Sequence, residues 1–275
     1  MKTSSILTER GAIHYRECPG NGPILLFLHG NLGSSRWWEP VLARLPGGWR
    51  GVAYDAIGYG RSERANGLER YSVPARVRDL IAFIDALALD GVHLVAHSTA
   101  TPVAIEYALI APERVATLTL VGPVPAAGAT TPQEAYPLLE RMSVDRELMA
   151  AALRVSAPHL DAGSPAFWDL VDDAMTLDPL TLPAIARGID AWRPGHRLRK
   201  LTLPVMLVRG EDDIMLEEKE AHRTLLAIPG AGNLEILRGA GHSPMLETPS
   251  GLTALLVTFI AEDWDDFEAI RQSVE

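Results

Sequence analysis

Residues 92–100 read Val92-His93-Leu94-Val95-Ala96-His97-Ser98-Thr99-Ala100, an apolar run that leads into a serine. The run is typical of a buried strand, and a helical pattern begins directly after it, at Pro102. A serine at such a junction, with small residues two positions away on both sides, indicates a strained turn that projects a nucleophilic hydroxyl. The flanking residues are Ala96 and Ala100, where the usual pattern has glycine. A serine that only caps the helix would fit the same place.

Strand-like and helical patterns alternate along most of the chain. Short runs rich in Ile, Leu and Val are typical of strands covered on both faces. The longer segments Val73–Leu89, Pro102–Ile110 and Ser250–Ile260 follow helical spacing. This alternation predicts an α/β fold with a mostly parallel central sheet and helices on both faces, preceded by a hairpin of Ser5–Glu9 and Ile13–Arg16. The expected strands are Ile24–Leu28, Gly51–Tyr54, Val92–Ala96, Ala116–Val121, Val205–Val208 and Leu234–Leu237.

Residues 125–195 interrupt this alternation. The segment contains no convincing strand, and its short helical patterns are separated by prolines. We therefore expect an α/β core built from residues 1–124 and 196–275. The segment 125–195 is expected to form a helical lid over one edge of the sheet.

Composition and charge limit the classes of function. The 275 residues carry a formal charge of −10 without a basic patch, which argues against a nucleic-acid partner. The single cysteine, Cys18, excludes an intramolecular disulfide. No membrane span or signal peptide is visible, and neither a metal-ligand spacing nor a complete dinucleotide fingerprint occurs. We expect a cytoplasmic protein without metal or cofactor, and the sequence does not predict its oligomeric state.

Two later strand ends carry what a serine nucleophile needs, a base and an acid that orients the base. The strand expected at 205–208 is followed by two acids, Asp212 and Asp213, and the next strand by a glycine-rich turn and His242. Because the carboxyl ends of parallel strands meet at one edge of a sheet, these groups are expected close to Ser98. On spacing alone, either aspartate could orient the histidine.

The order serine, aspartate, histidine is that of the α/β-hydrolase superfamily, which the sequence resembles over almost its whole length. The resemblance also rests on three loops: Gly210-Glu211-Asp212-Asp213, Gly241-His242-Ser243-Pro244 and Asp55-Ala56-Ile57-Gly58-Tyr59-Gly60-Arg61-Ser62. It implies the α/β-hydrolase fold and a catalytic triad of Ser98, Asp213 and His242. The family's Gly-x-x-Asp pattern selects Asp213 over Asp212.

The resemblance further implies an oxyanion hole. The strand 24–28 leads into His29-Gly30-Asn31, and in the family this loop supplies one backbone N–H. By position that donor is Asn31, and Thr99, which follows the nucleophile, supplies the second. Such donors stabilise the negative charge that develops on the substrate oxygen.

Aromatic and apolar side chains predict where the substrate lies. Tyr136, Met142, Phe167 and Trp168 belong to the expected lid, and Trp37 and Trp38 follow the oxyanion loop. We expect these six residues to border an apolar pocket. Packing into the core is the alternative for the two tryptophans, and packing onto the core is the alternative for the lid residues.

These features predict a serine hydrolase that cleaves carboxylic esters through an acyl-enzyme on Ser98. The expected partner is a small-molecule ester or lactone with an apolar acyl or aryl part. Relatives with the same triad open lactones or cleave carbon–carbon bonds, although the latter often carry tryptophan where this chain has Ser243. Another alternative is a small-molecule receptor on the hydrolase fold. Dehalogenation is disfavoured, because Ser98 would be left as an ether that water does not readily cleave.

Overall fold

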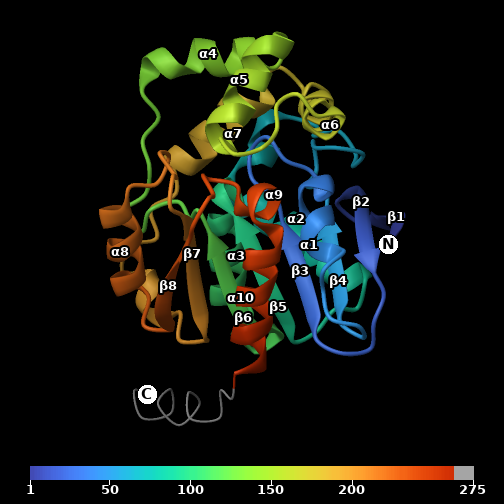
Figure 1. Cartoon of the computed structure of the whole chain (residues 1–275), viewed down its shortest axis with the longest axis vertical. Helices are drawn as coiled ribbons and strands as arrows, with labels where there is room; N and C mark the ends of the chain where they lie inside the picture. The colour runs from blue at the N-terminus through green and yellow to red at the C-terminus, as the bar shows by residue number, and fades with distance from the viewer. Residues whose placement is uncertain (263–275) are drawn as a thin grey trace.

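The fold is seen in a computed structural model that describes residues 1–262. Its sheet has eight strands in the order β1-β2-β4-β3-β5-β6-β7-β8 (Figure 1). β1 pairs antiparallel with β2 and β2 with β4, whereas all other neighbouring strands are parallel. The carboxyl ends of the parallel strands therefore share one edge. The strands are β1 (Lys2–Thr8), β2 (Gly11–Cys18), β3 (Ile24–Leu28), β4 (Arg50–Tyr54), β5 (Val92–His97), β6 (Val115–Val121), β7 (Val205–Gly210) and β8 (Ala231–Leu237).

Helices cover both faces of this sheet, which confirms the expected α/β-hydrolase architecture. α2 and α3 pack against each other on one face, and α1 packs against α10 on the other (Figure 1). α8 lies along the edge strand β8. The helices are α1 (Glu39–Leu42), α2 (Val73–Ala86), α3 (Thr101–Ile110), α4 (Tyr136–Met142), α5 (Arg146–Ser156), α6 (Pro165–Ala174), α7 (Thr181–Asp190), α8 (Glu218–Ala227), α9 (Pro244–Glu247) and α10 (Pro249–Ala261), with short 3-10 turns between them.

The elements predicted from apolar patterns are present, with ends that differ by no more than three residues. β8 begins at Ala231, whereas its predicted start was Leu234. The prediction was too short because β8 is an edge strand and is less buried. Its polar Asn233 still pairs with Met206 of β7, although the residue is only partly buried and breaks the apolar run. α2 stops before Leu89 because Ala88 adopts a left-handed conformation with φ 48°.

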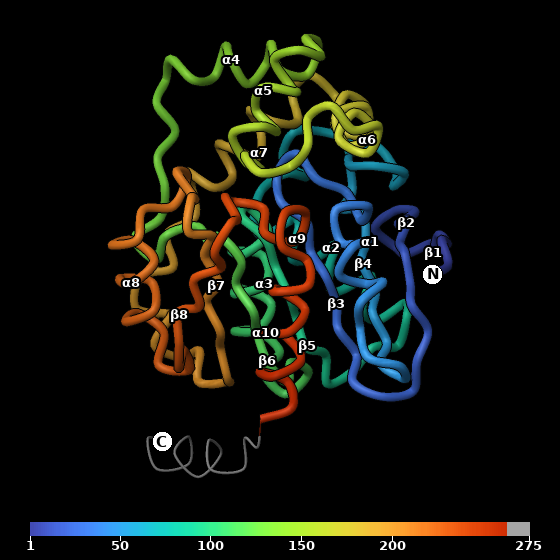
Figure 2. Tube along the Cα trace, in the orientation of Figure 1, coloured from blue at the N-terminus to red at the C-terminus, as the bar shows by residue number. Residues whose placement is uncertain are grey.

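Four helices, α4 to α7, connect β6 to β7 and lie above the carboxyl edge of the sheet (Figures 1 and 2). Their apolar faces are buried, and each such side chain stabilises the packing by roughly 1.5–3 kcal/mol. Polar contacts also hold them to the core: Arg36 Nε donates to Asp173 Oδ2 at 2.7 Å, and the Tyr71 and Thr181 hydroxyls lie 2.9 Å apart. The expected core and lid boundaries remain a prediction, and residues 263–275 of the expected core lie outside the described residues.

Candidate active site

Ser98 lies at the turn between β5 and α3 with φ 51°, in the left-handed region. Non-glycine residues adopt this region rarely, and such strain often accompanies a functional residue. Both alanines at the ±2 positions are buried, Ala96 fully and Ala100 to 1% exposure, so larger side chains would not fit. The loop that carries Gly30 also approaches the serine closely, because a Cβ on Gly30 would lie 3.0 Å from the Ser98 Cβ. The turn therefore holds the serine in one position.

His242 lies between Ser98 and Asp213. Its Nε2 is 2.9 Å from Ser98 Oγ, and its Nδ1 is 2.8 Å from Asp213 Oδ2. A carboxylate only accepts hydrogen bonds, so Nδ1 carries the proton and Nε2 is left free to accept from the serine hydroxyl. The three side chains thus form one continuous hydrogen-bonded series.

The environment of Asp213 favours its charged form. Burial opposes ionisation, but the hydrogen bond from His242 and the backbone N–H groups of Met215 and Leu216 outweigh it, so the pKa of the carboxyl is lowered. Those two N–H groups donate to Oδ1 at 2.8 and 3.0 Å. The neighbouring Asp212 instead accepts from His159 Nε2 at 2.7 Å in an exposed position. Of the two acids that the spacing allowed, the structure brings only Asp213 to His242.

Buried His97 supports the loop that carries His242. Its Nε2 donates to the backbone carbonyl of His242 at 2.9 Å. Burial, together with the nearby His242, lowers the pKa of His97 to about 3, so the ring is neutral and stays a simple donor. His97 therefore has a hydrogen-bonded packing role beside the site.

The loop that carries His242 is also bound to the end of α5. Glu247 Oε2 accepts from the Gly241 N–H at 2.8 Å, and its Oε1 accepts from the His159 N–H at 2.9 Å. The hydroxyls of Ser156 and Ser243 lie 2.7 Å apart and are buried. Sequence reasoning missed this connection, since nothing in the spacing of these residues indicates that they meet.

A cavity of about 300 Å³ opens beside Ser98 and His242. Asn31 and Thr99 both line it, at the positions expected for oxyanion donors. Within residues 1–262, neither of their backbone N–H groups makes a hydrogen bond. The amino end of α3 adds a positive dipole near the serine oxygen. The remaining wall is mostly apolar and includes Val124, Leu139, Ile185, Ile189, Met215 and Leu216.

None of the six aromatic and apolar residues predicted for the pocket lines this cavity. Trp37 and Trp38 are buried in the core, where Trp38 packs on the Phe27 ring at 4.9 Å between centroids. Large apolar side chains gain most from complete burial, and the core alternative therefore describes these tryptophans.

The four residues predicted from the insertion lie away from this cavity. Tyr136 donates to Asp190 at 2.8 Å, and Trp168 lies beneath the Arg146 guanidinium. Phe167 and Met142 are buried. The cavity-lining Ile185 and Ile189 were missed, although their spacing of four places both on one face of α7.

The described residues contain no group of three or more metal-ligating side chains that could hold an ion. Between residues 1 and 262, every helix is too short or too polar to cross a bilayer.

Comparisons with known proteins show the family and support the fold. A model of the alpha/beta hydrolase family matches residues 25–255. The carboxylesterase YbfK of Bacillus subtilis (strain 168) is 26% identical over 262 residues, which cover 88% of this chain and 81% of that protein. The structure of an esterase from Exiguobacterium antarcticum superimposes with a TM-score of 0.84 at 20% identity, covering 95% of this chain and 100% of that one. An enol-lactonase from Burkholderia xenovorans LB400 gives 0.82 at 18% identity, covering 94% and 100%.

Proposed function

Because the chain belongs to the alpha/beta hydrolase family, we propose that it is a serine hydrolase that cleaves carboxylic esters. The observation that carries this proposal is the hydrogen-bonded series from Ser98 Oγ through His242 to Asp213, with distances of 2.9 and 2.8 Å. Nucleophile and base lie within hydrogen-bond reach, and a third group orients the base, which is the arrangement that activates a serine.

The geometry supports the following reaction. His242 Nε2 accepts the proton of Ser98 as Oγ attacks the carbonyl carbon of the ester. The negative charge that forms on the carbonyl oxygen is stabilised by the N–H groups of Asn31 and Thr99, and each such donor is typically worth about 10²–10³ in rate. His242 then returns its proton to the leaving alcohol, and the acyl group stays on Ser98. A water molecule, deprotonated by His242, releases the acid and restores the serine.

The cavity supports a small substrate with an apolar acyl part. Its volume of about 300 Å³ is at the lower end of the range for ligand pockets, roughly 300–1,000 Å³. Ile185 and Ile189 of α7 and Leu139 of α4 provide apolar surface near the serine. A lactone is a cyclic ester, so the same steps would open one, with the leaving alcohol still attached to the acyl group.

The test is covalent labelling combined with turnover. A fluorophosphonate probe and a panel of p-nitrophenyl esters of rising acyl length, extended with simple lactones, would be offered to the wild type and to Ser98→Ala. We expect the wild type to be labelled and to turn over the shorter esters, while Ser98→Ala does neither. Absence of labelling and of turnover in the wild type would exclude the proposal. Rapid labelling with negligible turnover would favour a small-molecule receptor instead.

A further inference from the structure

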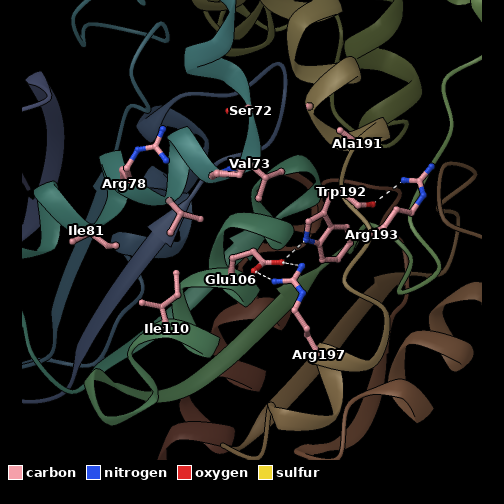
Figure 3. A pocket seen from close by; sticks show the side chains of 13 residues that line it. Ser72, Val73, Arg78, Ile81, Glu106, Ile110, Ala191, Trp192, Arg193 and Arg197 are labelled. Atoms are coloured by element: carbon pink, nitrogen blue, oxygen red, sulfur yellow. Dashed lines mark hydrogen bonds and ion pairs between the residues drawn. The ribbon is translucent and has the colours of Figure 1, made fainter.

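A second hollow lies on the face of the protein covered by α2 and α3 (Figure 3). Its volume, about 540 Å³, exceeds that of the cavity at Ser98. We call it the α2–α3 groove, and it lies between these two helices and the chain from α7 to Arg197. Apolar side chains form its floor: Val77, Ile81, Ile110 and Trp192. Ile110 is 61% exposed.

The tryptophan is held firmly in this floor. Trp192 is 5% exposed, and its indole N–H donates to Glu106 Oε1 at 2.8 Å. Glu106 is paired in turn with Arg197, whose Nη2 donates to the same oxygen at 2.8 Å while Nη1 contacts Oε2. Figure 3 shows these three side chains joined at the centre of the groove. The Glu106–Arg197 ion pair has no net charge, and the hydrogen bond to Glu106 holds Trp192 in place in the floor.

Two further arginines at the rim are not balanced by an acid. Arg193 donates only to neutral oxygens, the Trp192 carbonyl at 2.8 Å and the Thr130 hydroxyl at 3.3 Å. Within residues 1–262, the Arg78 side chain makes no hydrogen bond or ion pair. The groove thus carries two unpaired positive charges on a chain whose formal charge is −10. An apolar floor beside unpaired cations attracts a molecule with an apolar body and a negative group.

The groove is separate from the Ser98 cavity because α7 runs between them. Ile185, Ala186 and Ile189 line the cavity at Ser98, whereas Gly188 lines the groove, as does Ala191 just after the helix. Gly188 lets α7 pack closely against the turn before α2, since a Cβ there would lie 2.7 Å from the Tyr71 carbonyl oxygen.

We propose that the α2–α3 groove is a second binding site, for a small amphiphilic anion with a carboxylate or sulfonate group and an apolar tail. The anionic group pairs with Arg78, whose side chain has no partner among the described residues, and the tail lies on Val77, Ile81 and Ile110. The site does not depend on the proposed ester hydrolysis, because none of these residues contacts Ser98 or His242.

Octanoate and its uncharged counterpart 1-octanol provide a matched pair of probes. The indole N–H signal of Trp192, assigned by its loss in Trp192→Phe, would be followed by NMR during titration of the full chain. We expect octanoate to shift this signal saturably, and 1-octanol to bind at least tenfold more weakly. The imidazole ring signals of His242, which lines the Ser98 cavity, report binding in the other cavity.

Substitutions then test the charge. Arg78→Glu, at an exposed residue without partners, is expected to weaken octanoate binding at least tenfold. Arg199→Glu makes the same change of charge at an exposed residue that does not line the groove, and should leave the affinity unchanged. The proposal is overturned if the Trp192 signal does not move or if only the His242 signals move. It is equally overturned if 1-octanol binds as tightly as octanoate, or if the two arginine variants behave alike.

Discussion

Gly122 provides a sharp test of how the histidine is held, because it directly follows β6 and faces the His242 ring. A Cβ added at Gly122 would lie 2.8 Å from His242 Cε1 and 2.9 Å from Nδ1. Real Cβ atoms do not approach that closely, so Gly122→Ala must displace the ring. The backbone opposes the change as well, since φ at Gly122 is 53°.

The two costs can be estimated separately. A non-glycine residue in the left-handed region costs roughly 1–2 kcal/mol of stability. Restoring an ordinary carbon contact requires a ring shift of about 0.6 Å or more, and the ring is held on both sides by hydrogen bonds of 2.8 and 2.9 Å. A misplacement near 1 Å can lower the rate about 10²-fold. We therefore expect Gly122→Ala to lower kcat about 10- to 100-fold, which corresponds to about 1.4–2.7 kcal/mol of activation free energy.

Gly91 is the matched control. Its φ is 58°, close to that of Gly122, but a Cβ there would have no heavy atom within 4 Å. Gly91→Ala should lose similar stability in urea unfolding while its kcat on a p-nitrophenyl ester stays at the wild-type value. If both variants have the same kcat, contact with the His242 ring does not limit catalysis and the reasoning is refuted.

Three more outcomes are expected. Asp213→Asn should lower kcat about 10³–10⁴-fold because an amide does not hold His242 in the Nδ1–H tautomer. Asp212→Asn should keep kcat within about twofold. The reverse result would make Asp212 the acid of the triad. Burial lowers the pKa of His97 to about 3, whereas the unfolded residue takes up a proton near pH 6.5, so stability falls as pH decreases between these values. His97→Gln should reduce that slope by about 1.4 kcal/mol per pH unit in urea melts, and an unchanged slope would show that His97 is protonated in the fold. Glu247→Ala leaves the Gly241 N–H unpaired and should cost about 1–3 kcal/mol with a measurable loss of kcat, and an unchanged kcat would separate this contact from catalysis.

Much of the fold followed from local patterns. The strands of the sheet centre are continuous apolar runs because helices cover both of their faces, and such runs are visible without any tertiary information. The edge strand β8 was predicted too short, because residues such as Asn233 pair in the ladder without being buried. Burial produces the apolar pattern from which a strand is predicted. An edge strand is less buried, so its apolar pattern is weaker.

The sequence also predicted that three side chains lie close together, those of Ser98, Asp213 and His242. Each follows a parallel strand, and the direction of these strands brings their carboxyl ends to one edge of the sheet. The strain at Ser98 was equally predictable, since only small residues at the ±2 positions permit that turn.

The wall of the substrate cavity was decided only by tertiary packing. Trp37 and Ile185 are both large and apolar. Trp37 was predicted for the pocket but is buried in the core, whereas Ile185 was not predicted and lines the cavity. The hydrophobic effect rewards removal of apolar surface from water but does not specify the partner surface. Backbone direction and chain order therefore determine which reactive groups meet at Ser98, whereas the complete three-dimensional fit determines which apolar side chains surround them.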